Sequence, residues 1–197
     1  GRYGGSYEEG FTRRTVVNVP AKSTIKLNKL FGGAYGIDNN TVCDVYEGNV
    51  TWSSVEGRVG SIYGGNNNAR RTLYGRVNIN SPVWSDTEKG YMASVYGAGF
   101  GEDCWSQYTE VNLNKGSQVY IVYGGGENGR VSNVATAKQE YGVDKLKIAD
   151  PYTVGTKTYT YADNGLDNDL AKPRHDGKKY NTNVIIKRGA TVSNYAY

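Results

Sequence analysis

The chain repeats one stretch, VYIVYGGG at residues 119–126, several times. Earlier copies read MASVYGAG at 92–99, VGSIYGGN at 59–66 and LNKLFGGA at 27–34. Each copy has an apolar residue, two variable residues, a second apolar residue, an aromatic residue, a glycine, and then glycine or alanine. The aromatic residues at 31, 63, 96 and 123 follow one another at intervals of 32, 33 and 27 residues. A unit that recurs every few tens of residues indicates a repeat architecture.

A second short apolar segment lies between successive copies of this stretch. It reads VNV at 17–19, VTW at 50–52, VNI at 77–79, VNL at 111–113 and VII at 184–186. Alternation of apolar and polar residues is typical of a half-buried strand whose polar side chains face water. We therefore predict that each unit contains, in order, a strand, a turn, a second strand, a glycine-rich turn and a loop of variable length. The Gly-Gly step allows positive φ angles and a tight corner that a Cβ would obstruct.

These units are too short for a propeller blade, which needs four strands. Their length matches one coil of a parallel β-helix. We therefore predict an all-β chain, a β-solenoid of about five to six coils, with an antiparallel β-sandwich as the alternative fold. In a parallel β-helix equivalent residues stack. An aromatic ladder would then contain Phe31, Tyr63, Tyr96 and Tyr123, and an aliphatic ladder Leu30, Ile62, Val95 and Val122.

The repeat is interrupted in the second half of the chain. We predict one domain over residues 1–197, with an irregular insertion at about 134–182. Within it, TKTYTY at 156–161 alternates like an exposed strand, which indicates an elaborated coil or an inserted hairpin. The chain opens near a Tyr-Gly-Gly copy, and residues 192–197 resemble the approach to another. We therefore expect it to be a segment of a longer repeat protein.

Composition supports a thin, continuous core. Hydrophobic residues make up 38% of the chain, and 27 glycines and 18 tyrosines are in excess. Stacked repeats need only a core that continues from one unit to the next. The net charge of +4 is spread along the chain, without the basic stripe that nucleic-acid binding requires. The longest apolar runs are too short to span a membrane, so membrane insertion is not expected.

The cysteines and the histidine do not form a metal motif. Cys43, Cys104 and His175 have no zinc-ligand spacing. In a simple stack the two cysteines would lie two strand spacings apart, roughly 9–10 Å, which exceeds disulfide geometry. Two buried or free thiols are therefore favoured over a disulfide, which would require loops that fold toward each other.

Two tryptophans lie in variable loops beside acidic residues. Trp84 is near Asp86, and Trp105 is near Asp103. Exposed aromatic rings stack on sugar rings, and neighbouring carboxylates can accept hydrogen bonds from sugar hydroxyl groups. The commoner role of a large side chain in such a loop is to cover the core, and we favour that role.

A cluster of acidic residues is the one candidate metal site. Asp163, Asp167 and Asp169 offer the hard oxygen ligands that calcium prefers. The segment lacks the complete twelve-residue calcium loop and its terminal glutamate, so a solvated turn is the favoured interpretation. No other cofactor is predicted.

The sequence does not favour an enzyme. Polysaccharide lyases and glycoside hydrolases use grouped charged residues, and paired carboxylates cleave a glycosidic bond at separations of about 5–10 Å. The acidic Glu102-Asp103 pair, Glu110 and Asp86 and the basic Arg70-Arg71 pair belong to different loops, and nothing in the sequence shows that they converge. A carbohydrate-active enzyme on the same scaffold is the alternative function.

The Val-Tyr-Gly-Gly-Gly units separated by Val-x-Val strands resemble a known group of repeat proteins. These are the very long, Gly- and Tyr-rich proteins exported to the surface of Bacteroidetes-type bacteria. The resemblance covers roughly residues 3–133 and 183–197. It implies an extracellular, adhesin-like β-helix and carries over no catalytic residue. We therefore expect a structural or adhesive cell-surface module that displays its loops to glycans or to surface proteins and that can associate end to end.

Overall fold

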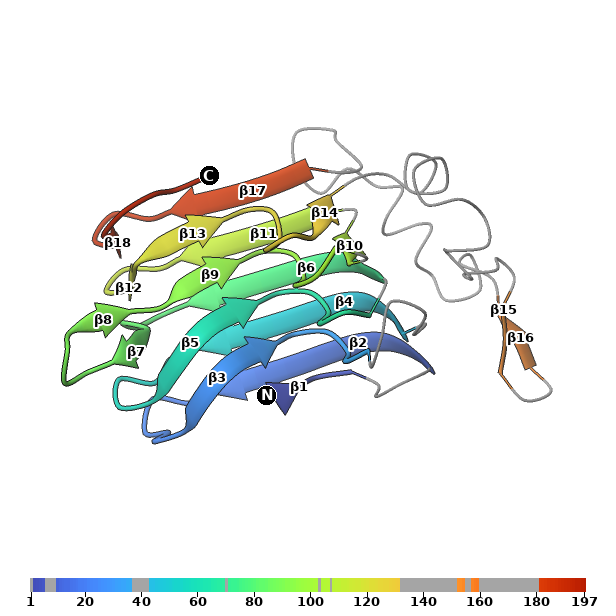
Figure 1. Cartoon of the computed structure of the whole chain (residues 1–197), viewed down its shortest axis with the longest axis horizontal. Coiled ribbons are helices and arrows are strands. Elements are labelled where there is room, and N and C mark those ends of the chain that lie inside the picture. Colours follow the sequence, from blue (N-terminus) through green and yellow to red (C-terminus); the bar gives the residue numbers. More distant parts are fainter. Residues whose placement is uncertain are drawn as a thin grey trace.

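The structure is a computed structural model. It describes residues 2–5, 10–36, 43–69, 71–102, 104–106, 108–131, 152–154, 157–159 and 181–197. The fold is all-β, and its two large sheets are mostly parallel (Figure 1). Within these residues no helix is long and apolar enough to cross a membrane.

The first sheet has seven strands and contains the repeated aromatic-glycine stretch. Its strands are β1 (Arg2–Tyr3), β3 (Lys26–Phe31), β5 (Arg58–Tyr63), β7 (Trp84–Asp86), β8 (Tyr91–Met92), β9 (Ser94–Tyr96) and β13 (Ile121–Tyr123). β12 (Gln118–Val119) and β18 (Thr191–Val192) pair separately in a small parallel sheet.

The second sheet also has seven strands and contains the other apolar segment of each unit. Its strands are β2 (Gly10–Val19), β4 (Cys43–Trp52), β6 (Arg71–Ile79), β10 (Trp105–Ser106), β11 (Tyr108–Leu113), β14 (Arg130–Val131) and β17 (Asn181–Ile186). β15 (Tyr152–Val154) and β16 (Lys157–Tyr159) form a separate antiparallel pair, which agrees with the inserted hairpin expected near this segment.

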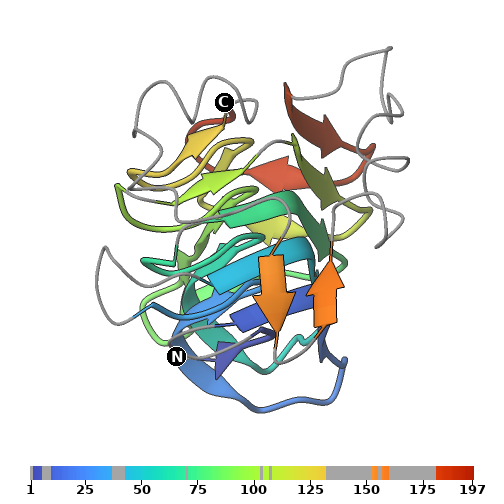
Figure 2. The ribbon, with the colours of Figure 1, turned by 90° about the vertical axis from the view of Figure 1, so that its right-hand side faces the viewer.

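The chain passes alternately between the two sheets and advances by one strand at each return. The colours accordingly run in chain order through the stack, from the blue strands at the bottom to the yellow and red strands at the top (Figures 1 and 2). Between named strands, antiparallel pairing is confined to β7–β8 and β15–β16 in the described part of the chain. The antiparallel sandwich is therefore wrong. The same pattern in every unit brings equivalent residues together only when the strands are parallel and in register.

The aromatic ladder forms as the repeat spacing predicts. Ring centroids are 4.7 Å apart for Phe31–Tyr63, 4.9 Å for Tyr63–Tyr96 and 5.1 Å for Tyr96–Tyr123, with nearly parallel planes. These distances match the spacing of neighbouring strands. Tyr197 extends the ladder, with its ring 5.0 Å from that of Tyr123. The neighbouring apolar residues Leu30, Ile62, Val95 and Val122 are buried in the core.

The second sheet supplies the opposite wall of this core. Val17, Val50, Val77, Val111 and Val184 pair in one row, and Val19, Trp52, Ile79, Leu113 and Ile186 in another. Most of these side chains join the apolar residues of the first sheet in one cluster. The short apolar segments therefore form a continuous core that is only two side chains thick.

The glycines after each aromatic residue permit close backbone approach, and not a positive φ. Positive φ occurs at Gly90, Gly101, Gly116 and Gly189 among the described glycines, all of which lie outside the Gly-Gly pairs. A Cβ added to Gly64 would lie 2.3 Å from the Gly97 carbonyl oxygen of the next unit. The Gly-Gly pairs therefore do not use the positive φ angles that glycine allows, and the obstruction of a Cβ comes from the neighbouring unit and not from the local turn.

One buried asparagine joins three backbone segments at a corner of the fold. The Asn66 Oδ1 accepts hydrogen bonds from the Ala34 amide and the Thr72 hydroxyl, each at 2.7 Å. Its Nδ2 donates to the Cys43 carbonyl at 3.0 Å and the Arg71 carbonyl at 2.9 Å. All four positions of the carboxamide are thus used, which is the condition for burying such a group without a large cost.

The insertion lies between two strands, β14 and β17, that occupy the same line of the second sheet. Val131 of β14 pairs with Ser106, and Asn181 of β17 pairs with Tyr108. Ser106 and Tyr108 are separated by one residue, so β14 and β17 continue the same line of the sheet. The repeat therefore stops after Val131 and resumes at Asn181, slightly earlier at each end than the sequence indicated.

Both cysteines are buried, and neither forms a disulfide. Asp44 pairs with Arg71, and Arg71 pairs with Trp105. The residues that precede Asp44 and Trp105 are the two cysteines, so these occupy equivalent positions two strands apart. The Cys104 Sγ lies 3.0 Å from the carbonyl oxygens of Ala69 and Phe100. The disulfide alternative is therefore not realised.

Candidate functional site

A hairpin projects from the first sheet in the third unit. It is formed by β7 and β8 and is labelled at the left of Figure 1. At its base the Ala93 amide donates a hydrogen bond of 2.8 Å to the Val83 carbonyl. Trp84 pairs with Arg58 of β5 on one side and with Met92 on the other. The hairpin is therefore an addition to an otherwise regular unit.

The turn of this hairpin is held by its own side chains. The Asp86 Oδ1 accepts hydrogen bonds from the Glu88 amide at 3.0 Å and the Lys89 amide at 3.2 Å. Gly90 has a φ of +69°, a conformation that favours glycine. The Ser85 hydroxyl lies 3.1 Å from the Tyr91 carbonyl oxygen, to which it donates. Asp86, predicted as a ligand-binding residue, thus has a structural role in this turn.

A hollow lies between the hairpin and the following units. We call it the tyrosine hollow; its volume is about 470 Å³, and it is lined by Ser85, Gly90, Tyr91, Met92, Tyr120 and Ser193. Tyr91 and Tyr120 are 60% and 44% exposed, so both rings present apolar surface to solvent. They come from segments that are distant in sequence, which only the stacking of units brings together.

The backbone at the far wall of this hollow is part of the regular stack. The Tyr120 amide donates to the Ala93 carbonyl at 2.8 Å. The Tyr120 carbonyl in turn accepts a hydrogen bond from the Asn194 amide at 2.9 Å. Tyr120 is therefore anchored between the unit below and the unit above, while its side chain remains exposed.

The structure does not gather the residues predicted to bind a ligand. Trp84 is half-buried and is not part of the lining of the tyrosine hollow. For Trp105 the structure describes only the backbone, in β10. Asp103 and the predicted calcium ligands Asp163, Asp167 and Asp169 lie outside the described residues. Sequence reasoning missed Tyr91 and Tyr120, although Tyr120 occupies a variable position of the repeat where an aromatic residue has no role in the ladder.

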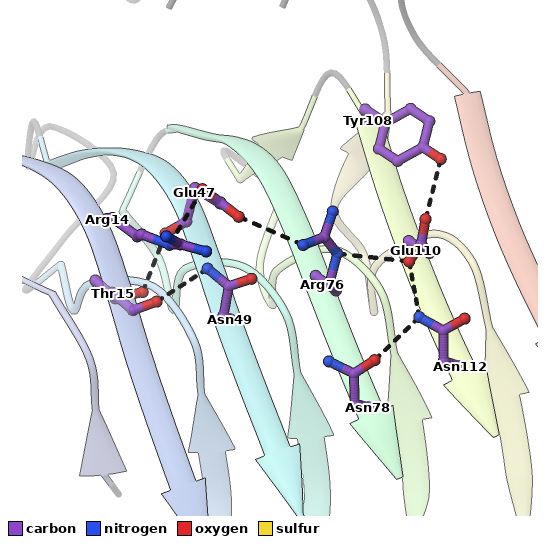
Figure 3. A network of polar contacts seen from close by, with 9 residues as sticks. All are labelled: Arg14, Thr15, Glu47, Asn49, Arg76, Asn78, Tyr108, Glu110 and Asn112. Carbon is purple, nitrogen blue, oxygen red and sulfur yellow. Dashed lines mark hydrogen bonds and ion pairs between the residues drawn. The ribbon is translucent and has the colours of Figure 1, made fainter. Parts of the chain in front are cut away.

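A polar network covers part of the second sheet (Figure 3). Arg76 lies between two carboxylates, 3.6 Å from Glu47 and 3.5 Å from Glu110. Glu47 also pairs with Arg14 at 3.3 Å. The charges thus alternate in sign from strand to strand, so each charged side chain has a partner of opposite charge on a neighbouring strand. Partly exposed pairs of this kind contribute roughly 0–1 kcal/mol each.

Further contacts bind the Glu110 carboxylate and continue the network. The Tyr108 hydroxyl donates to it at 3.3 Å and the Asn112 amide nitrogen at 2.7 Å. Asn112 also donates to the Asn78 carboxamide oxygen at 3.0 Å (Figure 3).

Asp86 lies on the hairpin of the first sheet and Glu110 in the second sheet, so the two belong to different faces of the stack. Among the described residues no group of three or more His, Cys, Asp or Glu could hold a metal ion.

Several tyrosines are held in the neutral form. Burial raises the pKa of Tyr63, and the hydrogen bond from its hydroxyl to the Glu127 carboxylate raises it further. Burial likewise raises the pKa of Tyr96 and Tyr108. Loss of a proton would place an uncompensated charge in the stack. These phenols therefore stay protonated at neutral pH and belong to the scaffold.

Comparison of the chain with protein-family models, with curated proteins and with solved structures found no match.

Proposed function

We propose that the chain is a β-solenoid and serves as a structural and adhesive module of a secreted, cell-surface repeat protein. The observation that carries the proposal is the register, which aligns equivalent residues of successive units in both sheets. The aromatic ladder from Phe31 to Tyr197 expresses it most clearly. A protein built in this way is extended by adding units, because each unit contacts only its neighbours.

The cross-unit contacts support a stiff scaffold. Backbone hydrogen bonds link the glycine of one unit to the aromatic residue of the next, as from the Gly32 amide to the Tyr63 carbonyl at 2.8 Å and from the Gly64 amide to the Tyr96 carbonyl at 2.9 Å. Ring stacking and buried aliphatic rows lie beside these bonds. Bending the stack would break several of them together, so the scaffold would hold an added loop in a fixed position.

The added hairpin supports a display role. Within the described residues no other unit carries a hairpin at this position, and this hairpin presents Tyr91 to solvent at one side of the stack. The two thiols are buried, and because the oxidation of cysteine depends on exposure, burial makes them poor targets for oxidation outside the cell. In this proposal the scaffold holds the hairpin away from the cell for contact with glycans or with surface proteins.

A retention assay tests the adhesive role. Beads that carry the folded chain are passed over surfaces coated with mixed polysaccharides, with extracellular proteins or with neither. We expect retention on at least one coated surface, and beads that carry the heat-unfolded chain serve as the matched control. Equal passage over all surfaces contradicts adhesion. Release of saccharide products from the coating would instead indicate a carbohydrate-active enzyme.

A further inference from the structure

We propose that the tyrosine hollow binds a neutral sugar ring of a polysaccharide, with Tyr91 and Tyr120 as the stacking residues. This proposal rests on the proposed adhesive function and assigns it a ligand class and a site. The juxtaposition that carries it is two exposed tyrosines, from separate units, on one concave surface of about 470 Å³. That volume lies within the range of roughly 300–1,000 Å³ that is typical of small-molecule sites.

The exposed rings indicate a ligand with an apolar face. In the described part of the chain most large apolar side chains are buried in the two-sheet core, but Tyr91 and Tyr120 are 60% and 44% exposed. Neither belongs to the aromatic ladder, so stacking between units does not account for them. Aromatic rings pack on flat apolar surface, and the phenol hydroxyl offers a hydrogen bond at the rim. The axial C–H face of a pyranose ring presents such a surface.

The lining also indicates a ligand that is uncharged and rich in hydroxyl groups. None of its six residues is charged, and two of them, Ser85 and Ser193, carry hydroxyl groups. The Ser85 hydroxyl donates to the Tyr91 carbonyl and can still accept a hydrogen bond, and the Ser193 hydroxyl can donate and accept. An acidic saccharide would find no cationic partner in this lining, whereas a neutral one leaves no charge unpaired. The combination therefore favours a neutral hexose.

The two walls of the hollow are positioned before any ligand arrives. The Asp86 cap, the Ser85 hydrogen bond and the left-handed Gly90 hold the hairpin that carries Tyr91. Backbone hydrogen bonds to Ala93 and Asn194 hold Tyr120. Little conformational entropy is then lost on binding, which allows a small contact area to provide measurable affinity.

Titration with defined oligosaccharides tests the proposal. Neutral glucan, mannan and galactan fragments, and uronate fragments as the acidic comparison, are added to the full chain, and binding is followed by calorimetry and by NMR. We expect at least one neutral fragment to bind. Tyr91→Ala and Tyr120→Ala should each weaken it roughly tenfold or more, as loss of an aromatic anchor does. Tyr91→Phe keeps the ring and should stay within about threefold of the wild type.

Tyr195→Ala is the matched control, because Tyr195 is 53% exposed but does not line the hollow; it should bind like the wild type. Circular dichroism establishes that each variant is folded. The proposal is overturned if no neutral fragment binds, if uronates bind more tightly, or if both alanine variants bind like the wild type. Beads retained on a protein coating alone would keep the adhesive function and still refute a sugar site. Loss of retention on every coating would instead refute the adhesive function itself.

Discussion

The glycine row shows how a neighbouring unit constrains a single residue. Gly48 and Gly75 of the second sheet face the Gly64 and Gly97 carbonyls, where an added Cβ would lie 2.4 and 2.3 Å from oxygen. On either side of these glycines the equivalent residues are Thr15 and Thr109, and their hydroxyls donate to the carbonyls of Gly32 and Gly124. Thr182 follows Thr109 and ends the row. At this row, therefore, the two sheets are close enough to accept either no side chain or one that hydrogen-bonds the carbonyl.

A pair of glycine substitutions tests this interpretation. Gly64→Ala places a methyl group against the Gly97 carbonyl and should lower the free energy of unfolding by about 1–3 kcal/mol or more. Gly125→Ala is the matched control, because an added Cβ there meets no atom within 4 Å and should change stability by less than about 0.5 kcal/mol. Urea denaturation measures both. Equal effects at the two positions would show that close approach is not the reason for the glycine.

Because Tyr63 and Tyr108 are buried, we expect the free energy of unfolding to fall in alkaline solution. A tyrosine in the unfolded chain loses its proton near pH 10, whereas the raised pKa values of Tyr63 and Tyr108 keep them protonated to higher pH in the folded chain. Above about pH 10 the folded state thus binds more protons than the unfolded state, so stability falls as pH rises. The slope is at most about 1.4 kcal/mol per pH unit for each tyrosine. Below pH 10 this contribution is fully present.

Urea denaturation at several pH values between about 8 and 11 measures this loss. The double variant Tyr63→Phe/Tyr108→Phe should lose less stability over the alkaline range than the wild type, even though its free energy of unfolding at neutral pH is lower. Tyr91→Phe is the control for the substitution itself, because it removes a phenol hydroxyl outside the buried stack. Parallel curves for the double variant and the wild type would contradict the assignment.

At the scale of elements, the insertion leaves a gap of only one residue position between β14 and β17 in the strand register. β14 and β17 lie on one line, and their partners Ser106 and Tyr108 are separated by a single position. Val131 and Asn181 are thus two residue steps apart, roughly 7 Å. The strands of this unit do not need the segment between them in order to pair.

Deletion of residues 133–180 tests whether the segment is separable. Ser132 alone then joins Val131 to Asn181, and we expect the shortened chain to keep its β-sheet circular dichroism and its urea midpoint within experimental error. Deletion of residues 132–180 is the matched control, because the direct junction shifts β17 by one residue and turns its core side chains to the other face. An unfolded first variant, or equal stability of the two, would refute the single-position insertion.

At the scale of the whole molecule, the second sheet has an open strand edge at each end of the described stack, at β2 and at β17. Within the described residues β17 pairs only with β11, and its Ile186 is 47% exposed although it continues a core row. Tyr197 continues the aromatic ladder and is 65% exposed. An unpaired edge beside uncovered core residues favours pairing with another chain.

We therefore expect the isolated chain to associate end to end as its concentration rises. Size-exclusion chromatography and electron microscopy should show short linear species. Ile186→Lys combined with Tyr197→Lys places charge on the open β17 end and should restore the monomer. Val55→Lys, at an exposed position in a turn, is the control and should leave association unchanged. A wild-type chain that stays a monomer at every concentration tested would contradict this prediction.

The repeat made the strands and their partners predictable. Equivalent residues recur at a nearly constant interval, and the apolar alternation within each unit assigns its strands, so the parallel register and the aromatic ladder followed from the sequence. Residues 134–182 broke this period, and the boundary of the insertion was correspondingly displaced by a few residues.

The candidate site was less predictable. Trp84 and Asp86 stood out by residue type, but the structure uses Asp86 in a turn and leaves Trp84 out of the hollow.

What the sequence alone determined was thus the part of the fold that depends on local period: which segments are strands, which residues stack and where the pattern is interrupted. Only the tertiary structure decided why the glycines are needed and where a ligand could bind. The glycines respond to carbonyl groups of the next unit, and the tyrosine hollow joins Tyr91, Tyr120 and Ser193 from three separate segments. Both depend on distances between units, which a linear pattern does not contain.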